Sequence, residues 1–267
     1  MRFENTNTYN FEGSLRGMRN PMNSWDRSDS FFGIVDLYDG NAMNDMAEKW
    51  GDEENSYQWL KTNGVLRASD TYDGLFEVAF IGPADMKLAQ SLILAGAEHA
   101  KFLRHIFVSV DITAPLYWWK EFDTYKVGTV ANSTSTMHKL SAEPITKEMF
   151  DFIENSDDLI VTQGKSICGE WEYVFSDYID DIVDMCENLR LKFKETGDAA
   201  YWKALIQILP NAYLQTRTVT MSYANLRNIY FQRQHHKLTE WNDFCNWIKT
   251  LPYSNELITL GGNNETY

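Results

Sequence analysis

The chain has 267 residues, of which 44% are hydrophobic and 14% aromatic, which is enough apolar material for a substantial core. Its net charge of −14 disfavours non-specific contact with duplex nucleic acid or an anionic membrane, so we expect neither as a partner. No window is apolar enough for a membrane span, the three cysteines form no CxxC pair, and the histidines show no metal-ligand spacing, so we expect a cytoplasmic protein without disulfides or a metal.

The first third of the chain predicts a strand, a short helix and an acidic segment. Residues 1–10 are predicted as the strand, and the helix that follows stops at Pro21. This helix places Arg16 and Arg19 three residues apart on one face. Residues 36–74 are acidic, contain a predicted short helix around 43–50, and are interpreted as a surface insertion.

Strands and helices alternate in the next part of the chain. Residues 75–82 are predicted as a strand, and Pro83 opens a helix at a position where proline is tolerated. The apolar run around residues 107–112 predicts a buried strand ended by "TAP", and Thr113 is expected to cap a helix. Residues 121–140, "EFDTYKVGTVANSTSTMHKL", end in small hydroxyl and amide side chains, which favour a loop.

The second half of the chain is mainly helical in its pattern. Apolar residues recur at three- and four-residue steps from Trp171 to Phe193, and Gly197 supplies a stop, which predicts one long amphipathic helix. "QTRTVTMS" predicts a strand from which Arg217 projects. Three more helices are expected over residues 199–210, 223–234 and 238–252. These elements predict an α+β protein with a single domain over residues 1–267.

Residues that suit binding chemistry are present, but each has an ordinary structural alternative. Glu98 and His99 fall between a helix and a strand, where a histidine also interacts with the helix dipole. Asn228 and Arg233 share a predicted helix, where an ordinary solvated face has the same composition. No Walker loop, dinucleotide-binding glycine motif or zinc-protease motif is present.

The order of these segments carries more information than any one of them. "GAEHAKF", "IFVSVDI" and "TAPLYWWKEFDT" are followed by "YKV", then by Asn132 and Ser135, and later by "LPNAYLQTRTVT" and "YANLRNIYFQRQHHKLTEW". In this order they resemble the flavin-dependent thymidylate synthases, the ThyX family, over residues 75–145 and 200–250. The chain departs from the family where "YKV" replaces an Arg-His-Arg triplet, which makes it resemble a divergent, phage-like member.

The resemblance implies a fold and a reaction. The fold would be a central twisted, mostly antiparallel sheet packed with helices, together with a helical portion. The reaction would be methylation of dUMP at C5, with methylenetetrahydrofolate as carbon donor, FAD as cofactor and NADPH as reductant. Such enzymes need no protein nucleophile, and they are homotetramers with shared active sites.

The resemblance also implies roles for particular residues. The residues expected to contact dUMP are Arg233, Arg217, Ser135 and Lys126. Those expected at the flavin are Glu98, His99, Asn132, Asn228 and Tyr125. Arg16 or Arg19 would replace the charge that the altered triplet lacks. Two alternatives stay open, namely a flavoenzyme of the same fold that modifies another pyrimidine nucleotide, for example by hydroxymethylation, and a non-catalytic nucleotide-binding descendant.

Overall fold

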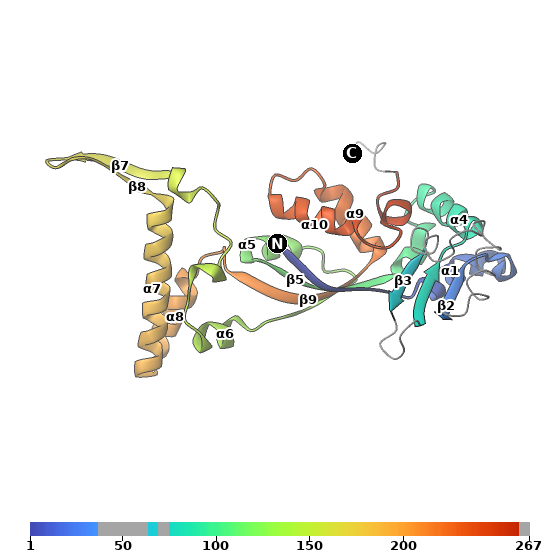
Figure 1. The fold of residues 1–267 in the computed structure, drawn as a ribbon, viewed down its shortest axis with the longest axis horizontal. Helices are drawn as coiled ribbons and strands as arrows, with labels where there is room; N and C mark the ends of the chain where they lie inside the picture. Colours follow the sequence, from blue (N-terminus) through green and yellow to red (C-terminus); the bar gives the residue numbers. More distant parts are fainter. Residues whose placement is uncertain (37–63, 69–74, 262–267) are drawn as a thin grey trace. The chain divides into compact units, whose positions relative to one another are not determined.

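The structure is a computed structural model that describes residues 1–36, 64–68 and 75–261 (Figure 1). It divides into two compact units. The first unit consists of Met1–Asn5 and Val110–Val219, and the second of the described residues within Thr6–Ser109 and Thr220–Tyr267. The helix expected around 43–50 and most of the acidic segment lie outside the described residues. A single domain over the whole chain stays a prediction.

A four-stranded sheet has the order β1-β5-β9-β6. Its strands are β1 (Arg2–Tyr9), β5 (Phe107–Pro115), β9 (Leu214–Ser222) and β6 (Thr129–Ser133). The Thr218 hydroxyl donates to Asp111, and the hydroxyl oxygens of Thr113 and Thr216 lie 2.8 Å apart. Asp111 therefore lies opposite Thr218, and Thr113 lies opposite Thr216. Because residue numbers rise along β5 as they fall along β9, the two strands are antiparallel.

The first unit also contains a helical portion and a separate hairpin. Its remaining strands and α-helices are α5 (Leu116–Phe122), α6 (Thr136–Ala142), β7 (Ile160–Ser166), β8 (Gly169–Val174), α7 (Phe175–Thr196) and α8 (Ala199–Ile208). Short 3₁₀ turns lie at η4 (Lys147–Met149) and η5 (Ser156–Asp158). One face of α7 enters a core that is made of Leu140, Ile145, Phe150, Ile179, Val183, Cys186, Leu205 and Tyr213. Burial of this apolar stripe holds the helix in place.

The second unit combines a three-stranded sheet with short helices. Its antiparallel sheet has the order β2-β4-β3, with β2 (Phe31–Asp36), β4 (Leu75–Phe80) and β3 (Val65–Ala68). Its helices are α1 (Phe11–Arg19), η1 (Asn20–Met22), η2 (Trp25–Arg27), α4 (Pro83–Leu94), η3 (Ala100–His105), α9 (Tyr223–Arg233), α10 (Thr239–Lys249) and the π-helical η6 (Ser254–Ile258). The Phe11 ring meets the edges of Tyr223 and Tyr253, each at 5.8 Å between centroids.

The predicted α+β class with a central antiparallel sheet is confirmed. Pro83 stands in the first turn of α4, as expected, because the missing proline N–H has no partner within the helix at that position. Gly197 ends α7 with φ +69, a left-handed conformation in which glycine carries no steric cost. Among the described residues, no helix combines the length and apolar character needed to cross a bilayer.

Three local expectations are wrong. Thr113 does not cap a helix, because β5 continues through Pro115 and buries the Thr113 side chain. Thr129–Ser133 form β6, which pairs with β9, and α6 begins at Thr136, so Thr134 and Ser135 are the part of the expected polar loop that lies outside a strand or helix. Trp171 lies in β8, not in the long helix, because it pairs across the hairpin with Gly164.

Candidate functional site

A cavity of about 680 Å³ lies in the second unit. Residues of α1, of the turn after α4 and of η3 line it. Its titratable lining residues are Arg16, Glu98, His99, Lys101 and His105. Two cations and two histidines therefore face this cavity with a single carboxylate.

The negative charge of Glu98, the carboxylate of this cavity, is offset by the neighbouring Lys101. Glu98 forms an ion pair with Lys101, with 3.1 Å between Nζ and Oε2. The hydrogen bond from Lys101, and then its charge, hold the pKa of Glu98 below the ordinary value, so the group is ionised at neutral pH. Arg16 is exposed and carries the further positive charge of the cavity. The lining thus favours an anionic ligand.

Hydrogen bonds fix the two walls of the cavity. The Ser14 hydroxyl of α1 donates to the Phe102 carbonyl of η3 at 2.7 Å, and Ser14 is fully buried. The Asn10 side-chain amide donates to the His105 carbonyl at 2.9 Å. Because α1 and η3 are joined at both ends of their contact, Arg16 is held on the same cavity as Lys101 and His105.

Gly17 keeps part of the α1 wall open. It is helical, and a Cβ atom built on it meets no heavy atom within 4 Å. Gly17 also lines the cavity. A side chain at this position would therefore extend into open space rather than into the protein.

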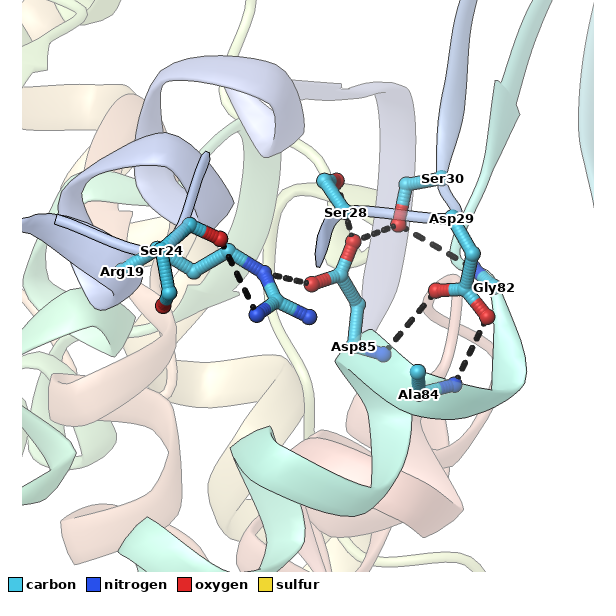
Figure 2. A network of polar contacts seen from close by, with 8 residues as sticks. All are labelled: Arg19, Ser24, Ser28, Asp29, Ser30, Gly82, Ala84 and Asp85. Carbon is cyan, nitrogen blue, oxygen red and sulfur yellow. Dashed lines mark hydrogen bonds and ion pairs between the residues drawn. The ribbon is translucent and has the colours of Figure 1, made fainter. Parts of the chain in front are cut away.

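Arg19 has a different environment from Arg16, although both lie on α1. Figure 2 shows its guanidinium pointing at Asp85 of α4, with Nε 2.5 Å from Oδ1. The hydroxyls of Ser28 and Ser30 donate to the other oxygen of Asp85, at 2.5 and 2.6 Å. Asp85 is fully buried and Arg19 is 6% exposed. Asp85 is therefore the structural partner of Arg19. A contact between Arg19 and a ligand stays a prediction.

Asp29 completes this network at the start of α4. Its carboxylate accepts from the backbone N–H of Ala84 at 2.8 Å and of Asp85 at 3.0 Å (Figure 2). These are two of the N–H groups that a helix leaves without internal partners. The carboxylate also suits the positive end of the helix dipole. The network thus joins α1, the segment 24–30 and α4.

The other predicted residues of the second unit lie on α9. The Arg233 guanidinium lies over the Trp241 ring, 4.5 Å from its centroid, which is a cation–π contact. Asn228 is exposed, and its side-chain oxygen accepts from Gln232. Neither residue lines the cavity of Arg16, so their ligand roles stay predictions.

In the first unit, Arg217 is the centre of a polar cluster. It lies over the Trp119 ring at 4.2 Å from the centroid, and it donates to Asp123 at 2.7 Å and to the Gln215 side chain at 2.9 Å. Gln215 in turn donates to the Thr134 carbonyl at 3.3 Å. Arg217 is thus positioned by three described neighbours, and the cluster extends to the polar segment.

The remaining predicted residues lie in that segment and before it. Ser135 caps α6 by accepting from the His138 N–H, and Asn132 is an exposed residue of β6. Lys126 is exposed, and Tyr125 packs beside Phe122 with 6.4 Å between ring centroids. The capping role of Ser135 explains its residue type without a ligand, and its contact with dUMP stays a prediction.

Glu98, His99, Asn132, Asn228 and Tyr125 are the residues expected at the flavin, with Arg16 or Arg19 as the compensating cation. Of these, Arg16, Glu98 and His99 lie on one cavity, and the other four residues do not line it. The sequence reasoning missed Asn10, Lys101 and His105. A signal for two of them existed in the basic stretch "AKFLRH", which forms a 3₁₀ helix, so its side chains do not follow the strand alternation expected there.

No protein-family model matches the sequence, and neither does any curated protein. The chain is similar in structure to flavin-dependent thymidylate synthase ThyX from Helicobacter pylori, solved with FAD and dUMP, at 17% identity and a TM-score of 0.48 over 85% of this chain and 95% of that one. A second structure of that enzyme gives 15% identity and a TM-score of 0.49, over 89% of this chain and 100% of that one. The UMP/dUMP methylase PolB from Streptomyces cacaoi, bound with 5-Br UMP, gives 13% identity and 0.48, over 68% and 84%.

Proposed function

We propose that the chain is a flavin-dependent enzyme that methylates dUMP at C5, with its flavin held in the cavity of the second unit. One observation carries this proposal. Glu98 and His99 are expected at the flavin, and Arg16 or Arg19 is expected to supply the missing positive charge. Of these residues from separate parts of the sequence, Glu98, His99 and Arg16 line the same cavity.

The cavity suits an anionic dinucleotide. Its volume of about 680 Å³ lies within the range of small-molecule sites. Arg16 and Lys101 are the cations for the diphosphate, because a guanidinium forms paired hydrogen bonds with phosphate oxygens and an ammonium acts as a point charge. Met18, Leu92 and Phe102 supply apolar surface for a flat ring.

When bound, the flavin supplies the hydride of a reductive methylation, for which NADPH is the proposed reductant and methylenetetrahydrofolate the carbon donor. The residues of this chain bind and orient. Arg16 neutralises phosphate charge, Glu98 fixes the Lys101 ammonium through their ion pair, and His99 and His105 offer ring N–H groups.

The nucleotide contacts form a second part of the proposal. Arg217, Lys126, Ser135 and Arg233 are the residues proposed to contact dUMP, and Asn132, Asn228 and Tyr125 are also proposed for the flavin, although these last three do not line the cavity. The stacking of Arg217 on Trp119 supports this assignment, because it leaves a guanidinium pre-oriented rather than free to rotate. The proposed assembly is a homotetramer in the cytosol with shared active sites.

The direct test is product analysis. The full chain is incubated with dUMP, FAD, methylenetetrahydrofolate and NADPH, and the nucleotides are identified by mass spectrometry. We expect dTMP, and we expect the same chain to restore growth of a thymidine auxotroph. A 5-hydroxymethyl product would support the alternative modification, and unchanged dUMP with no bound flavin would contradict an enzymatic role.

A further inference from the structure

Another cavity, of about 190 Å³, lies within the first unit and is called the Tyr213 cavity below. Besides Tyr213, its lining includes Thr113 of β5 and Leu214 and Thr216 of β9. Successive residues of a strand point to opposite faces of a sheet, so Thr216 faces this cavity while Arg217 faces the other side. The Tyr213 cavity is therefore separate from the Arg217 cluster, and it shares no lining residue with the cavity proposed for the flavin.

A buried phenol opens onto this cavity without a hydrogen-bond partner. Tyr213 is 2% exposed, and its ring packs against Phe150 with 5.8 Å between centroids. Among the described residues, none forms a hydrogen bond with its hydroxyl. Burial, and then the charge of Glu143, raise the pKa of Tyr213, so the group stays an O–H donor at neutral pH. Buried polar groups are normally hydrogen-bonded, and a ligand in the cavity would supply the acceptor that Tyr213 lacks.

A pair of threonine hydroxyls adds a further donor. The hydroxyl oxygens of Thr113 and Thr216 lie 2.8 Å apart, so one of the two donates to the other. The accepting hydroxyl keeps its own hydrogen, and no other side-chain hydrogen bond joins either threonine to the part of the chain that the structure describes. Thr113 is buried, so this hydrogen also requires an acceptor from within the cavity. The Tyr213 cavity thus presents two uncharged donors to one ligand.

Charges of both signs line the cavity without pairing to each other. Arg2 and Lys139 are the cations, and Glu143 and Glu148 the carboxylates. Within the described ranges, none of these four side chains forms an ion pair. A hydrogen bond from Thr146 is the main cause that lowers the pKa of Glu148, so this group is ionised at neutral pH. A ligand of one sign would be repelled by half of the lining charges, whereas a ligand with both signs can pair with each half.

The size of the cavity narrows the class of ligand. A volume of about 190 Å³ equals that of roughly six water molecules. A small α-amino acid such as alanine, with about six non-hydrogen atoms, is of this order. It also carries a carboxylate and an ammonium group on neighbouring carbon atoms, which matches donors, cations and carboxylates that line one small space.

We propose that the Tyr213 cavity binds a small free α-amino acid in its zwitterionic form. The carboxylate of the ligand accepts from the Tyr213 hydroxyl and from the threonine pair, and it is attracted by Arg2 and Lys139. The ammonium group of the ligand is held by Glu143 and Glu148. The proposal is independent of the reaction proposed above, because it concerns a different cavity and a different ligand.

Isothermal titration calorimetry of the full chain tests the class of ligand. Glycine, L-alanine and L-serine are titrated first, and we expect saturable binding of at least one. The amide of the tightest ligand lacks the carboxylate, and its N-acetyl derivative lacks the ammonium group. Each should bind at least tenfold more weakly, because each loses charge-assisted hydrogen bonds. No binding of the three amino acids up to about 10 mM, or equal affinity for either derivative, would overturn the proposal.

A single hydroxyl group tests the location. Tyr213→Phe keeps the ring that packs on Phe150, and its unligated form should unfold at the wild-type temperature or above, because the deleted hydroxyl has no described partner. Its affinity for the amino acid should fall by roughly two- to tenfold, the effect of one hydrogen bond. The matched control is Tyr178→Phe, an exposed tyrosine of α7 outside the cavity lining, which should bind like the wild type. Unchanged affinity in Tyr213→Phe, or equal weakening in both variants, would contradict this site.

Discussion

At the scale of single residues, Arg16 and Arg19 show what a sequence pattern predicts and what it leaves open. Their spacing correctly places both on one helix, but one is exposed at a cavity and the other is 6% exposed beside Asp85. The difference depends on Asp85, which lies 66 residues after Arg19 and accepts hydrogen bonds from Ser28 and Ser30 as well. No local periodicity encodes such a partner.

Removing the Asp85 carboxylate should strongly destabilise the second unit. Asp85→Ala leaves the Arg19 guanidinium buried without its counter-ion and removes the acceptor of Ser28 and Ser30. We expect the free energy of unfolding to fall by about 3–5 kcal/mol, measured by urea denaturation. Asp26→Ala, an exposed aspartate of η2, is the control and should change it by less than about 0.5 kcal/mol. Similar losses for both variants would contradict the role of the network.

The three cysteines should differ sharply in reactivity. Burial raises the pKa of Cys186 and of Cys245 to about 11, so almost no thiolate forms at these positions at pH 8. Cys168 is exposed in the hairpin turn. In the native protein, mass spectrometry should therefore find a maleimide on Cys168 alone. Early labelling of Cys186 would show that its core opens readily.

At the scale of elements, helices and strands with strong periodicity are predictable, and the β7–β8 hairpin is not. The step from Trp171 to Phe175 matches helical spacing, so the pattern extends the helix too far toward the N-terminus. What overrides it is the cross-strand pairing of Trp171 with Gly164 and the turn at Gly169, which has φ +123. Strand pairing is a non-local effect that single-strand periodicity does not contain.

Helix α7 should be held partly by one ionised carboxylate. Glu187 accepts from Nη2 and Nε of Arg190, at 2.5 and 2.7 Å, and from the Ile145 N–H at 2.8 Å. The Arg190 hydrogen bonds are the main cause that lowers the pKa of Glu187 below its ordinary value of 4.5. A lowered pKa in the folded state means that this stabilisation is present above pH 4.5 and is lost as pH falls through the lowered value.

Glu187→Gln should therefore lower the free energy of unfolding at neutral pH by about 1.5–3 kcal/mol, the scale of hydrogen bonds to charged groups. The difference from the wild type should shrink as pH falls below 4.5. Glu195→Gln is the control on the same helix, because Glu195 pairs with Lys192 in solvent. The measurement is urea unfolding across acid pH, and a difference that stays constant with pH would contradict the ionic origin.

At the scale of the whole molecule, the α+β class follows from the order of local patterns, whereas the candidate site does not. The cavity brings α1 to η3 through Ser14 and Asn10, whose partners lie 88 and 95 residues further along the chain. The identities of Glu98 and His99 were visible in the sequence, but their proximity to Arg16 was not. The proximity of Arg217 to Trp119 is likewise not visible in the sequence, because it is the strand β9 and the helix α5 that bring the two residues together.

Blocking the cavity tests whether it is the flavin site without altering its charges. Gly17 lines the cavity, and a Cβ there meets no atom within 4 Å, so Gly17→Leu should fold and place its side chain in the ligand space. Replacing a helical glycine should also stabilise α1, by up to about 1 kcal/mol. Equal or higher thermal stability together with weaker binding of FAD is the expected pattern.

The most direct measurement is the affinity of the purified full chain for FAD, followed by the change in flavin fluorescence on titration. We expect saturable binding that is weakened at least tenfold in Arg16→Ala, since a charge-assisted hydrogen bond contributes about 1.5–3 kcal/mol. We expect a loss of similar size in Gly17→Leu, because the leucine side chain would occupy the ligand space. Arg104→Ala, an exposed arginine of η3 outside the cavity lining, should bind like the wild type. Absence of FAD binding, or equal affinity in all four proteins, would contradict the assignment of this cavity.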